Sequence, residues 1–184
     1  EGFRPGLLNR PGGASTALAG GGTYTVPFAL DTDEVTNWEL GWKLDLLDRQ
    51  VRFNGAAFFV QIEGLQTTIF DPSITNLFFS DNAADAEIYG LEGDVTYAPA
   101  DLPGLTVTGA FSLLDTEITE VLTPTDDVVV GGELAYAPSV QLNARARYEW
   151  QVTDRTAYVQ GQVVYSGESR SDIIEINAAD VDSY

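Results

Sequence analysis

Three residue types are missing from this chain, and each absence removes a class of chemistry. Its 184 residues include no Cys, no His and no Met. Without Cys there are no structural disulfides, and without Cys or His there are no zinc sites of the usual kind and no catalytic triads built on these side chains. The lack of Cys also suits a chain that passes through an oxidising compartment such as the periplasm.

Positive charge is scarce. The chain has 9 basic and 28 acidic residues, a formal net charge of −19. A nucleic-acid partner is therefore not expected, because phosphate binding needs a cationic face that releases counterions. The acids lie mostly in connections rich in Gly, Pro and Asp, while the segments between them are apolar or mixed.

Long hydrophobic runs are absent as well. No stretch reaches the roughly 18 apolar residues of a transmembrane helix. The first six residues, 1–6, have no charged start, apolar core or cleavage site, and there is no initiator Met. We therefore expect both ends to be cut from a longer chain, so that residues 1–184 form part of one domain.

What is present is a period of two. In residues 38–46 the even positions are apolar and the odd positions are small or charged. The even set is Trp38, Leu40, Trp42, Leu44 and Leu46, and the odd set is Glu39, Gly41, Lys43 and Asp45. This alternation predicts a β-strand, since a helical stripe would return every third or fourth residue.

Five further segments alternate in the same way and predict strands. They are residues 51–66, 87–98, 105–118, 139–150 and 155–166. The pattern blurs at residues 58–60, where a β-bulge and a shared face are the two alternatives. Each strand has about 10–14 residues, longer than most strands of soluble sheets and close to what a tilted strand needs to cross a bilayer.

The connections alternate between short and long. The short ones are residues 47–50, 99–104 and 151–154; the long ones are roughly 5–36, 67–86 and 119–138, and residues 167–184 begin another. In an up-and-down meander this sorts short turns to one rim and long loops to the other, as in outer-membrane barrels. The sequence therefore predicts an all-β, antiparallel, up-and-down transmembrane β-barrel wall.

The polarity of the faces leaves two alternatives, because a soluble β-sandwich also has one apolar and one polar face. Aromatic residues near strand ends favour the barrel, since they suit a membrane interface. They are Trp38, Trp42, Tyr97, Tyr148, Trp150 and Tyr165. The polar face also carries charges of both signs, as the interior of a barrel does.

Four segments resemble the TonB-dependent outer-membrane receptors. Residues 34–43 (Glu-Val-Thr-Asn-Trp-Glu-Leu-Gly-Trp-Lys) and 51–59 (Val-Arg-Phe-Asn-Gly-Ala-Ala-Phe-Phe) resemble successive barrel strands of that family. Residues 2–6 resemble the end of the preceding strand, and residues 86–94 a strand returning from an external loop. The resemblance covers nearly the whole chain and identifies it as a piece of the C-terminal half of such a barrel.

The resemblance implies a barrel of about 22 strands with an N-terminal plug, energised by TonB from the inner membrane. It further implies an outer-membrane location and uptake of a large solute such as a ferric siderophore. The expected partners are outer-membrane lipid, the plug of the same parent chain, TonB and the solute. The chain itself contains no segment that resembles a plug, a TonB box or the terminal aromatic strand of such barrels.

Two other functions remain as alternatives: a passive outer-membrane channel, and a soluble β-sandwich that acts as a binding or adhesion module. We expect no enzyme, no cofactor and no metal. The pair Glu92 and Asp94 shares one strand face, but nothing else converges on it, so a structural role for these carboxylates is favoured over acid–base catalysis.

Four residues are candidates for ligand binding. Phe78 and Phe79 form an aromatic pair in a long loop, where they would contact the solute or pack against neighbouring loops. Arg145 and Arg147 share a polar face, where they would attract an anionic ligand or pair with Glu149, Glu92 or acids of the plug. Three groups of loop acids have the oxygen ligands that calcium prefers, but none has the spacing of an EF-hand, so solvated acids are favoured for them: Asp31/Asp33/Glu34, Asp81/Asp85/Glu87 and Asp180/Asp182.

Overall fold

Strands dominate the molecule. The computed structural model describes residues 1–9, 15–18, 21–70, 78–175 and 177–184, and in those residues it contains no helix. The six long strands are β4 (Asp33–Leu46), β5 (Val51–Ile69), β6 (Phe79–Tyr97), β7 (Leu105–Val121), β8 (Val140–Val152) and β9 (Arg155–Ser166). The short strands are β1 (Gly2–Arg4), β2 (Ser15–Ala17), β3 (Thr23–Thr25), β10 (Ser169–Arg170) and β11 (Asp180–Val181).

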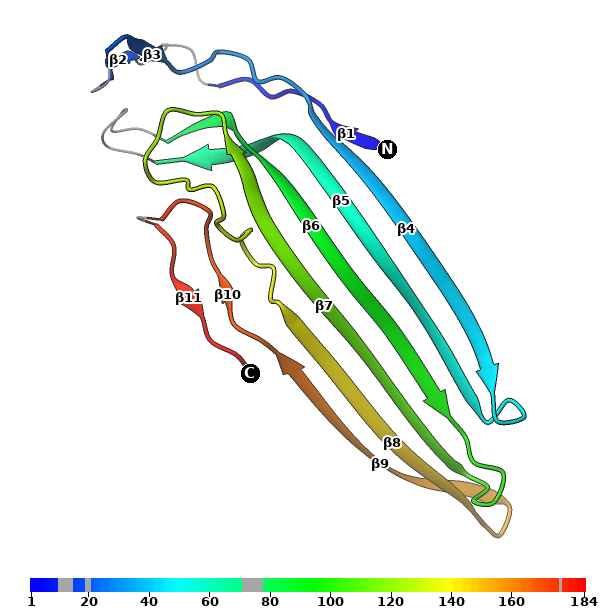
Figure 1. Ribbon diagram of the computed structural model, residues 1–184. Coiled ribbons are helices and arrows are strands. Elements are labelled where there is room, and N and C mark those ends of the chain that lie inside the picture. Colours follow the sequence, from blue (N-terminus) through cyan, green and yellow to red (C-terminus); the bar gives the residue numbers. More distant parts are fainter. Residues whose placement is uncertain (10–14, 19–20, 71–77, 176) are drawn as a thin grey trace.

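One sheet holds all six long strands. It has seven strands in the order β1-β4-β5-β6-β7-β8-β9, and every neighbouring pair is antiparallel. From β4 to β9 the strands lie side by side in sequence order and bend together along their length (Figure 1). This confirms the predicted all-β, antiparallel, up-and-down wall. The sheet does not close on itself within this chain, and β2–β3 and β10–β11 form separate two-stranded ribbons.

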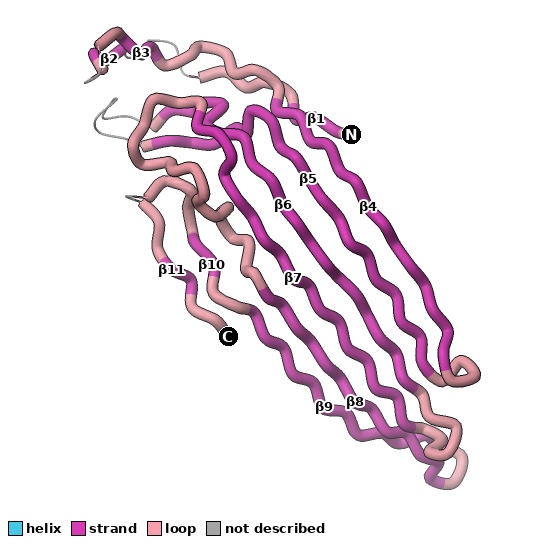
Figure 2. The backbone as a smooth tube through the Cα atoms, viewed as in Figure 1, coloured by secondary structure: helices cyan, strands magenta, loops and turns pink. Residues whose placement is uncertain are grey.

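The connections are sorted between the two ends of the sheet, as predicted. Residues 47–50, 98–104 and 153–154 make short turns at what we name the turn end. The described parts of the connections 5–32 and 122–139, together with residues 167–175 and 177–184, gather at the opposite end, which we name the loop end (Figure 2). A soluble meander has no physical reason to sort its loops in this way, whereas a membrane barrel does.

Backbone geometry tightens the turn end. Leu47, Asp48 and Arg49 all have positive φ, of 53°, 53° and 67°, and the Gln50 N–H donates to the Leu47 carbonyl at 3.0 Å. In the next turn Gly104 has a φ of 97°, and its carbonyl accepts from the N–H of Glu149 at 2.9 Å. That bond ties the second turn to β8, so neighbouring hairpins are fixed to one another at this end.

The structure differs from the sequence-based prediction in the length of one loop and in the position of one bulge. The long loop expected at 67–86 is short, because β5 continues to Ile69 and β6 begins at Phe79. The bulge considered at 58–60 lies farther along β5 instead, with register shifts between Ile62 and Gln66. At that point Gly64 adopts a positive φ of 66°, a conformation open to glycine, and its N–H donates to Asp85 at 2.7 Å.

The alternation that blurred in the sequence at residues 58–60 persists in the structure. Phe59 stacks with Trp38 on one face of the sheet, while Phe58 points to the other face and covers Gly90 on β6. A Cβ placed on Gly90 would lie 2.0 Å from the Phe58 ring. An apolar residue at the position of Phe58 therefore fills the space left by a glycine and does not mark an irregularity.

Candidate functional site

The apolar face of the main sheet is open to the surroundings. It carries the even residues of β4 and β8 and the odd residues of β5, β6, β7 and β9, as the register between strands shows. Leu40 is 72% exposed and Val163 64% exposed on this face. In the part of the chain that the structure describes, no second sheet covers it. The soluble β-sandwich is therefore wrong for this molecule, since it would bury these residues between two sheets.

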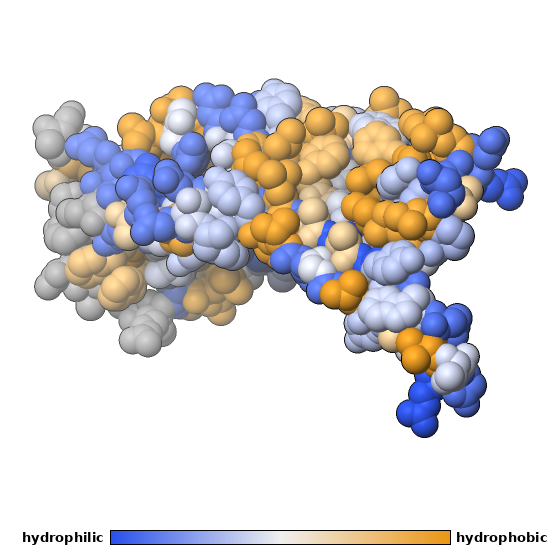
Figure 3. Space-filling view, turned by 90° about the horizontal axis from the view of Figure 1, so that it is seen from below, coloured by the Kyte–Doolittle hydropathy of each residue, from blue (hydrophilic) through white to orange (hydrophobic). Residues whose placement is uncertain are grey.

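Aromatic residues mark both ends of the apolar face. Trp38, Phe59 and Tyr89 stack across three strands on the side of the loop end, with ring centroids 5.5 Å and 4.6 Å apart. Tyr148 and Trp150 stack near the turn end, 5.9 Å apart. In the view from below, hydrophobic side chains gather over the part of the molecule away from the uncertain loops, with hydrophilic ones at its ends (Figure 3). The apolar band is thus bounded by two aromatic rows.

The opposite face is polar, and two ion pairs lie on it. Arg52 on β5 donates to Asp45 on β4 at 3.0 Å. Arg147 donates to Glu149 at 2.6 Å, and its guanidinium lies 3.7 Å from the centre of the Tyr158 ring. The pairing of Arg147 with Glu149 confirms one of the two roles predicted for this residue.

Arg145 differs from its neighbour. Its register partners are Thr108 on β7 and Gln162 on β9, and among the described residues no carboxylate lies within ion-pair distance of it. The Arg145 guanidinium therefore faces the polar side of the wall with its charge uncompensated by the described part of the chain.

A depression lies on the polar face where small residues meet. Its volume is about 680 Å³, and its floor includes Gly41, Ala56 and Ala110. The charged residues around it are Glu39, Lys43, Glu92 and Asp94. Asp94 accepts from the side-chain amide of Asn54 at 3.1 Å. Three carboxylates against one ammonium make this depression attractive to a cationic group.

At the loop end the connections fold over the polar face and form a small core. In β7 the even residue Ile118 belongs to the polar face, yet it is only 1% exposed, whereas the odd residues Asp115 and Glu117 stay exposed. The core joins the loops to the outer parts of β5, β6 and β7 through Val26, Ile69, Phe79, Ala83, Ala84, Ile118, Val128, Ile173 and Ile174. The loops therefore cover the polar side of the wall and leave the other side bare.

Polar contacts hold the first loop to this core. Tyr24 donates its hydroxyl to Asp81 on β6, and Thr123 donates to the same carboxylate at 2.9 Å. Burial, together with the hydrogen bond to and the charge of Asp81, raises the pKa of Tyr24 well above its ordinary value. Just before the same loop, Arg4 at the end of β1 forms an ion pair with the buried Asp33 and also donates to the carbonyl of Gln66 at 2.9 Å.

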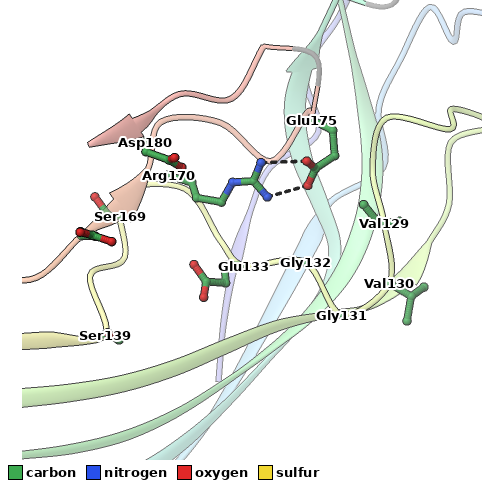
Figure 4. Close-up of a pocket in the computed structure, with 11 residues that line it drawn as sticks. Val129, Val130, Gly131, Gly132, Glu133, Ser139, Ser169, Arg170, Glu175 and Asp180 are labelled. Atoms are coloured by element: carbon green, nitrogen blue, oxygen red, sulfur yellow. Dashed lines mark hydrogen bonds and ion pairs between the residues drawn. The ribbon is translucent and has the colours of Figure 1, made fainter. Parts of the chain in front are cut away.

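Two depressions open among these loops. The first, of about 650 Å³, holds Arg170, which donates to both oxygens of Glu175 at 2.6 and 2.8 Å (Figure 4). That ion pair raises the pKa of Arg170 and lowers that of Glu175. The other acids around it are Glu133, Glu168 and Asp180. With four carboxylates and one guanidinium, this depression repels anions.

The second depression, of about 410 Å³, is chemically mixed. Arg4, Gln66 and Tyr136 line it, as do Ser171 and Asp172. Tyr136 is 72% exposed and has a positive φ of 55°, and its N–H donates to the carbonyl of Arg170 at 2.7 Å. Sequence reasoning missed Tyr136, and its only signal there was an aromatic residue inside a long connection.

The structure separates the four predicted site residues. Phe78 is 74% exposed at the loop end, whereas Phe79 is 5% exposed and packs in the loop core next to Tyr24. Of the two roles predicted for the pair, Phe79 therefore takes the packing role against a neighbouring loop, while Phe78 stays exposed. Arg145 and Arg147 lie within β8, away from Phe78, so the four do not form one site.

The acids weighed as calcium ligands are used differently. Asp33 pairs with Arg4, Asp81 accepts from Tyr24 and Thr123, and Asp85 accepts from the N–H of Gly64. In the described residues no group of three or more acidic side chains is arranged to hold a metal ion. Likewise, no helix in the described part of the chain has the length and apolar character needed to cross a membrane.

Comparison with known proteins agrees with this geometry. The family model described as "TonB dependent receptor-like, beta-barrel" matches residues 1–184. The chain belongs to the TonB-dependent receptor β-barrel family. Its fold is therefore the wall of a transmembrane barrel, and its location is the outer membrane. In such a barrel the exposed apolar face is the one suited to lipid, the polar face lines the interior, the turn end is periplasmic and the loop end external.

Solved structures of TonB-dependent receptors share this fold. The ferric yersiniabactin uptake receptor FyuA from Yersinia pestis matches with a TM-score of 0.67 and 14% identity, over 100% of this chain and 24% of its own. The ferric preacinetobactin receptor BauA from Acinetobacter baumannii matches with a TM-score of 0.64 and 20% identity, over 99% of this chain and 24% of its own. The siderophore receptor PiuA from the same organism gives 0.62 and 23%, over 84% and 21%.

The chain thus spans about a quarter of the length of the first two receptors. No curated protein sequence matches it. The family consists of receptors and transporters rather than enzymes.

Proposed function

We propose that this chain is part of the wall of a receptor that takes up a large solute, such as a ferric siderophore, from outside the cell. The observation that carries the proposal is the loop core, which covers the polar side of the wall at the external end and leaves the lipid side bare. A passive channel gains from an open mouth, whereas a receptor needs a surface there that closes over the interior and meets its ligand. The solved relatives that it resembles are described as receptors for ferric siderophores.

The remaining parts of the proposal follow from family membership. A plug of the same parent chain would fill the interior, with TonB supplying energy through it. Arg145 lies on the polar face without a carboxylate partner among the described residues, so it is suited to an acid of the plug or to an anionic solute passing along the wall. At the mouth we assign first contact with the solute to Phe78, and to Tyr136 beside Arg4 in the mixed depression.

The experiment uses the full-length protein in detergent and a panel of ferric siderophores, with binding followed by quenching of tryptophan fluorescence. We expect saturable binding of one class of chelate, and uptake of its iron by cells only when TonB is functional. Phe78→Ala and Arg145→Gln should each weaken binding by about tenfold, the loss of one good contact. Arg49→Gln removes the same charge at the turn end and should leave affinity unchanged.

Two results would contradict the proposal. Ion conductance through the purified protein in planar bilayers, without TonB and without ligand, would indicate a passive channel. Equal weakening by Arg145→Gln and Arg49→Gln would show that general loss of positive charge, and not contact on the polar face, governs binding.

A further inference from the structure

The apolar face contains a groove across β7 and β8. Its floor is made by Gly109 and Ala144, which are register partners, and its volume is about 480 Å³. Its walls are Phe53, Val95, Phe111, Leu142, Val163 and Tyr165. One row nearer the turn end, the register partners Ala146 and Gly161 continue the line of small residues.

Elsewhere on the same face, aromatic rings cover the glycines. A Cβ on Gly55 would lie 2.5 Å from the ring of Trp42, and one on Gly93 would lie 2.8 Å from that of Phe111. No ring covers Gly109 in this way, and a Cβ on Gly161 would meet nothing within 4 Å. The groove is therefore a distinct hollow in the apolar face. No ring covers Gly109 in its floor, whereas rings cover Gly55 and Gly93 elsewhere on that face.

The walls decide the chemistry of the occupant. Apart from the hydroxyl of Tyr165, they present aliphatic and aromatic carbon, which suits a hydrocarbon chain better than a polar ligand. Because the face lies in the outer membrane, the abundant molecules of that chemistry are the acyl chains of its lipids.

Charge decides which leaflet supplies the lipid. Arg155 begins β9 opposite Val152, and by alternation it belongs to the apolar face. It is exposed, and among the described residues no carboxylate is within ion-pair distance. At the external end the same face carries Asp115 and Glu117, which would repel a lipid phosphate. The favourable place for the phosphate is therefore the turn end, which faces the periplasm.

The spacing fits one leaflet. Val163 in the groove wall lies eight residues along β9 from Arg155, or about 26 Å at ~3.3 Å per residue. With a strand tilt of about 40°, this corresponds to about 20 Å of depth, close to half the thickness of a bilayer including its headgroups. An acyl chain whose headgroup lies at Arg155 thus reaches the groove with its distal part.

We propose that this groove binds an acyl chain of a phospholipid from the periplasmic leaflet, with the lipid phosphate at Arg155. The bound lipid fills the hollow that Gly109 and Ala144 leave in the wall. The inference rests on the family and on the geometry of the apolar face, and it is independent of the solute.

The test uses full-length protein purified in detergent, incubated with palmitoyl-oleoyl phosphatidylglycerol and analysed by native mass spectrometry. Wild-type protein should retain the lipid. Ala144→Leu fills the groove and should reduce retention by about tenfold, the loss of contact with about two methylene groups. Its matched control is Ala57→Leu, the same change at another exposed alanine of the same face, which should retain the lipid fully.

Arg155→Gln tests the headgroup and should reduce retention by about fivefold, whereas Arg49→Gln at the same end should have no effect. Equal retention by Ala144→Leu and Ala57→Leu would overturn the proposal, as would retention of lipopolysaccharide in place of the phospholipid.

A second measurement needs no variant. Dihexanoyl phosphatidylglycerol carries the same phosphate, but its chains are too short to reach the groove from Arg155. Wild-type protein should retain the long-chain lipid and release the short-chain one. Equal retention of both would mean that the headgroup alone is bound, and the groove would then have no role.

Discussion

At the scale of single residues, one glycine is required by the turn between β6 and β7. Gly104 combines a φ of 97° with a backbone oxygen of Glu149 at 2.1 Å from the place of a Cβ. Both features exclude a side chain, because the left-handed conformation and the rigid neighbouring strand leave no room to adjust.

Gly104→Ala should therefore lower the free energy of unfolding by about 2 kcal/mol or more, through strain at positive φ and loss of the bond from the Glu149 N–H. Gly161→Ala is the control, because it makes the same chemical change at a glycine whose Cβ would meet nothing and whose φ is not positive. Thermal unfolding of the full-length protein, followed by far-UV circular dichroism, measures both. An equal midpoint for the two variants would refute the role assigned to Gly104.

A second residue, Tyr24, makes the loop packing sensitive to pH. Its pKa is raised in the folded protein, chiefly by burial and then by Asp81. A group whose pKa is raised by folding contributes stability below its unfolded pKa, here about 10, and that stability is lost as the pH rises above it.

We expect the first loop to loosen above a pH of about 10, visible as faster amide hydrogen exchange around Tyr24 after correction for the intrinsic pH dependence of exchange. Tyr24→Phe should remove this alkaline step while exchange within β8 stays unchanged. Persistence of the same step in Tyr24→Phe would assign it to another group.

At the scale of the elements, the loop core is a separate layer of packing added to the wall. Ile174 and Ile118 are at most 1% exposed, and they join a loop to a strand that the sequence separates widely. The loops that pack on the strands here are held by apolar contact together with a few hydrogen bonds, such as those of Ile118 with Gly131 and Gly132, and not by a continuous ladder.

Ile174→Ala should therefore destabilise the loop layer by about 2–5 kcal/mol and leave the strands intact. Limited proteolysis should then cut within residues 122–139 or 167–175, with far-UV circular dichroism unchanged. Val130→Ala, at a 61% exposed position of the neighbouring loop, is the control and should behave like wild type. Loss of strand signal together with loop protection would show that the two layers fold as one unit.

The sequence predicted the strands better than the loops, for a physical reason. A period of two is imposed wherever one face meets apolar and the other polar surroundings, so β4, β8 and their register could be recognised in the alternation. The end of β5 and the start of β6 were missed. Both lie beyond the membrane, where the loops bury polar residues such as Gln66 as well as apolar ones such as Ala84, so the alternation disappears. For the same reason Phe79 was assigned to a loop, although it is the first residue of β6.

Residues brought together by loop packing left no local pattern. The approach of Tyr24 to Asp81, or of Tyr136 to Arg170, joins segments far apart in the chain and depends on how the loops fold over the wall. The charges of the polar face were easier to predict, since Arg147 and Glu149 lie two residues apart on one strand.

At the scale of the whole molecule, the unclosed sheet has two edges. On its outer side β9 is bonded only at Ser166, which exchanges two backbone hydrogen bonds with Tyr184, and at the other edge β1 pairs with just the first residues of β4, Asp33 to Val35. The backbone groups along the rest of β4 and along the outer side of β9 before Ser166 are thus available for pairing. In hydrocarbon such groups are costly, so a wall of this kind is stable only when further strands close it.

The 184-residue chain expressed alone should therefore associate through these edges, even in detergent that covers the apolar face. Size-exclusion chromatography with light scattering should show oligomers whose population rises with concentration, whereas the full-length protein in the same detergent should remain a monomer. A monodisperse monomer of the isolated chain with full β-sheet signal would contradict this, because it would require the exposed edges of β4 and β9 to be satisfied without any partner strand. Such a monomer would also remove the physical reason for this sheet to close into a barrel, and with it the argument that the polar face lies inside one.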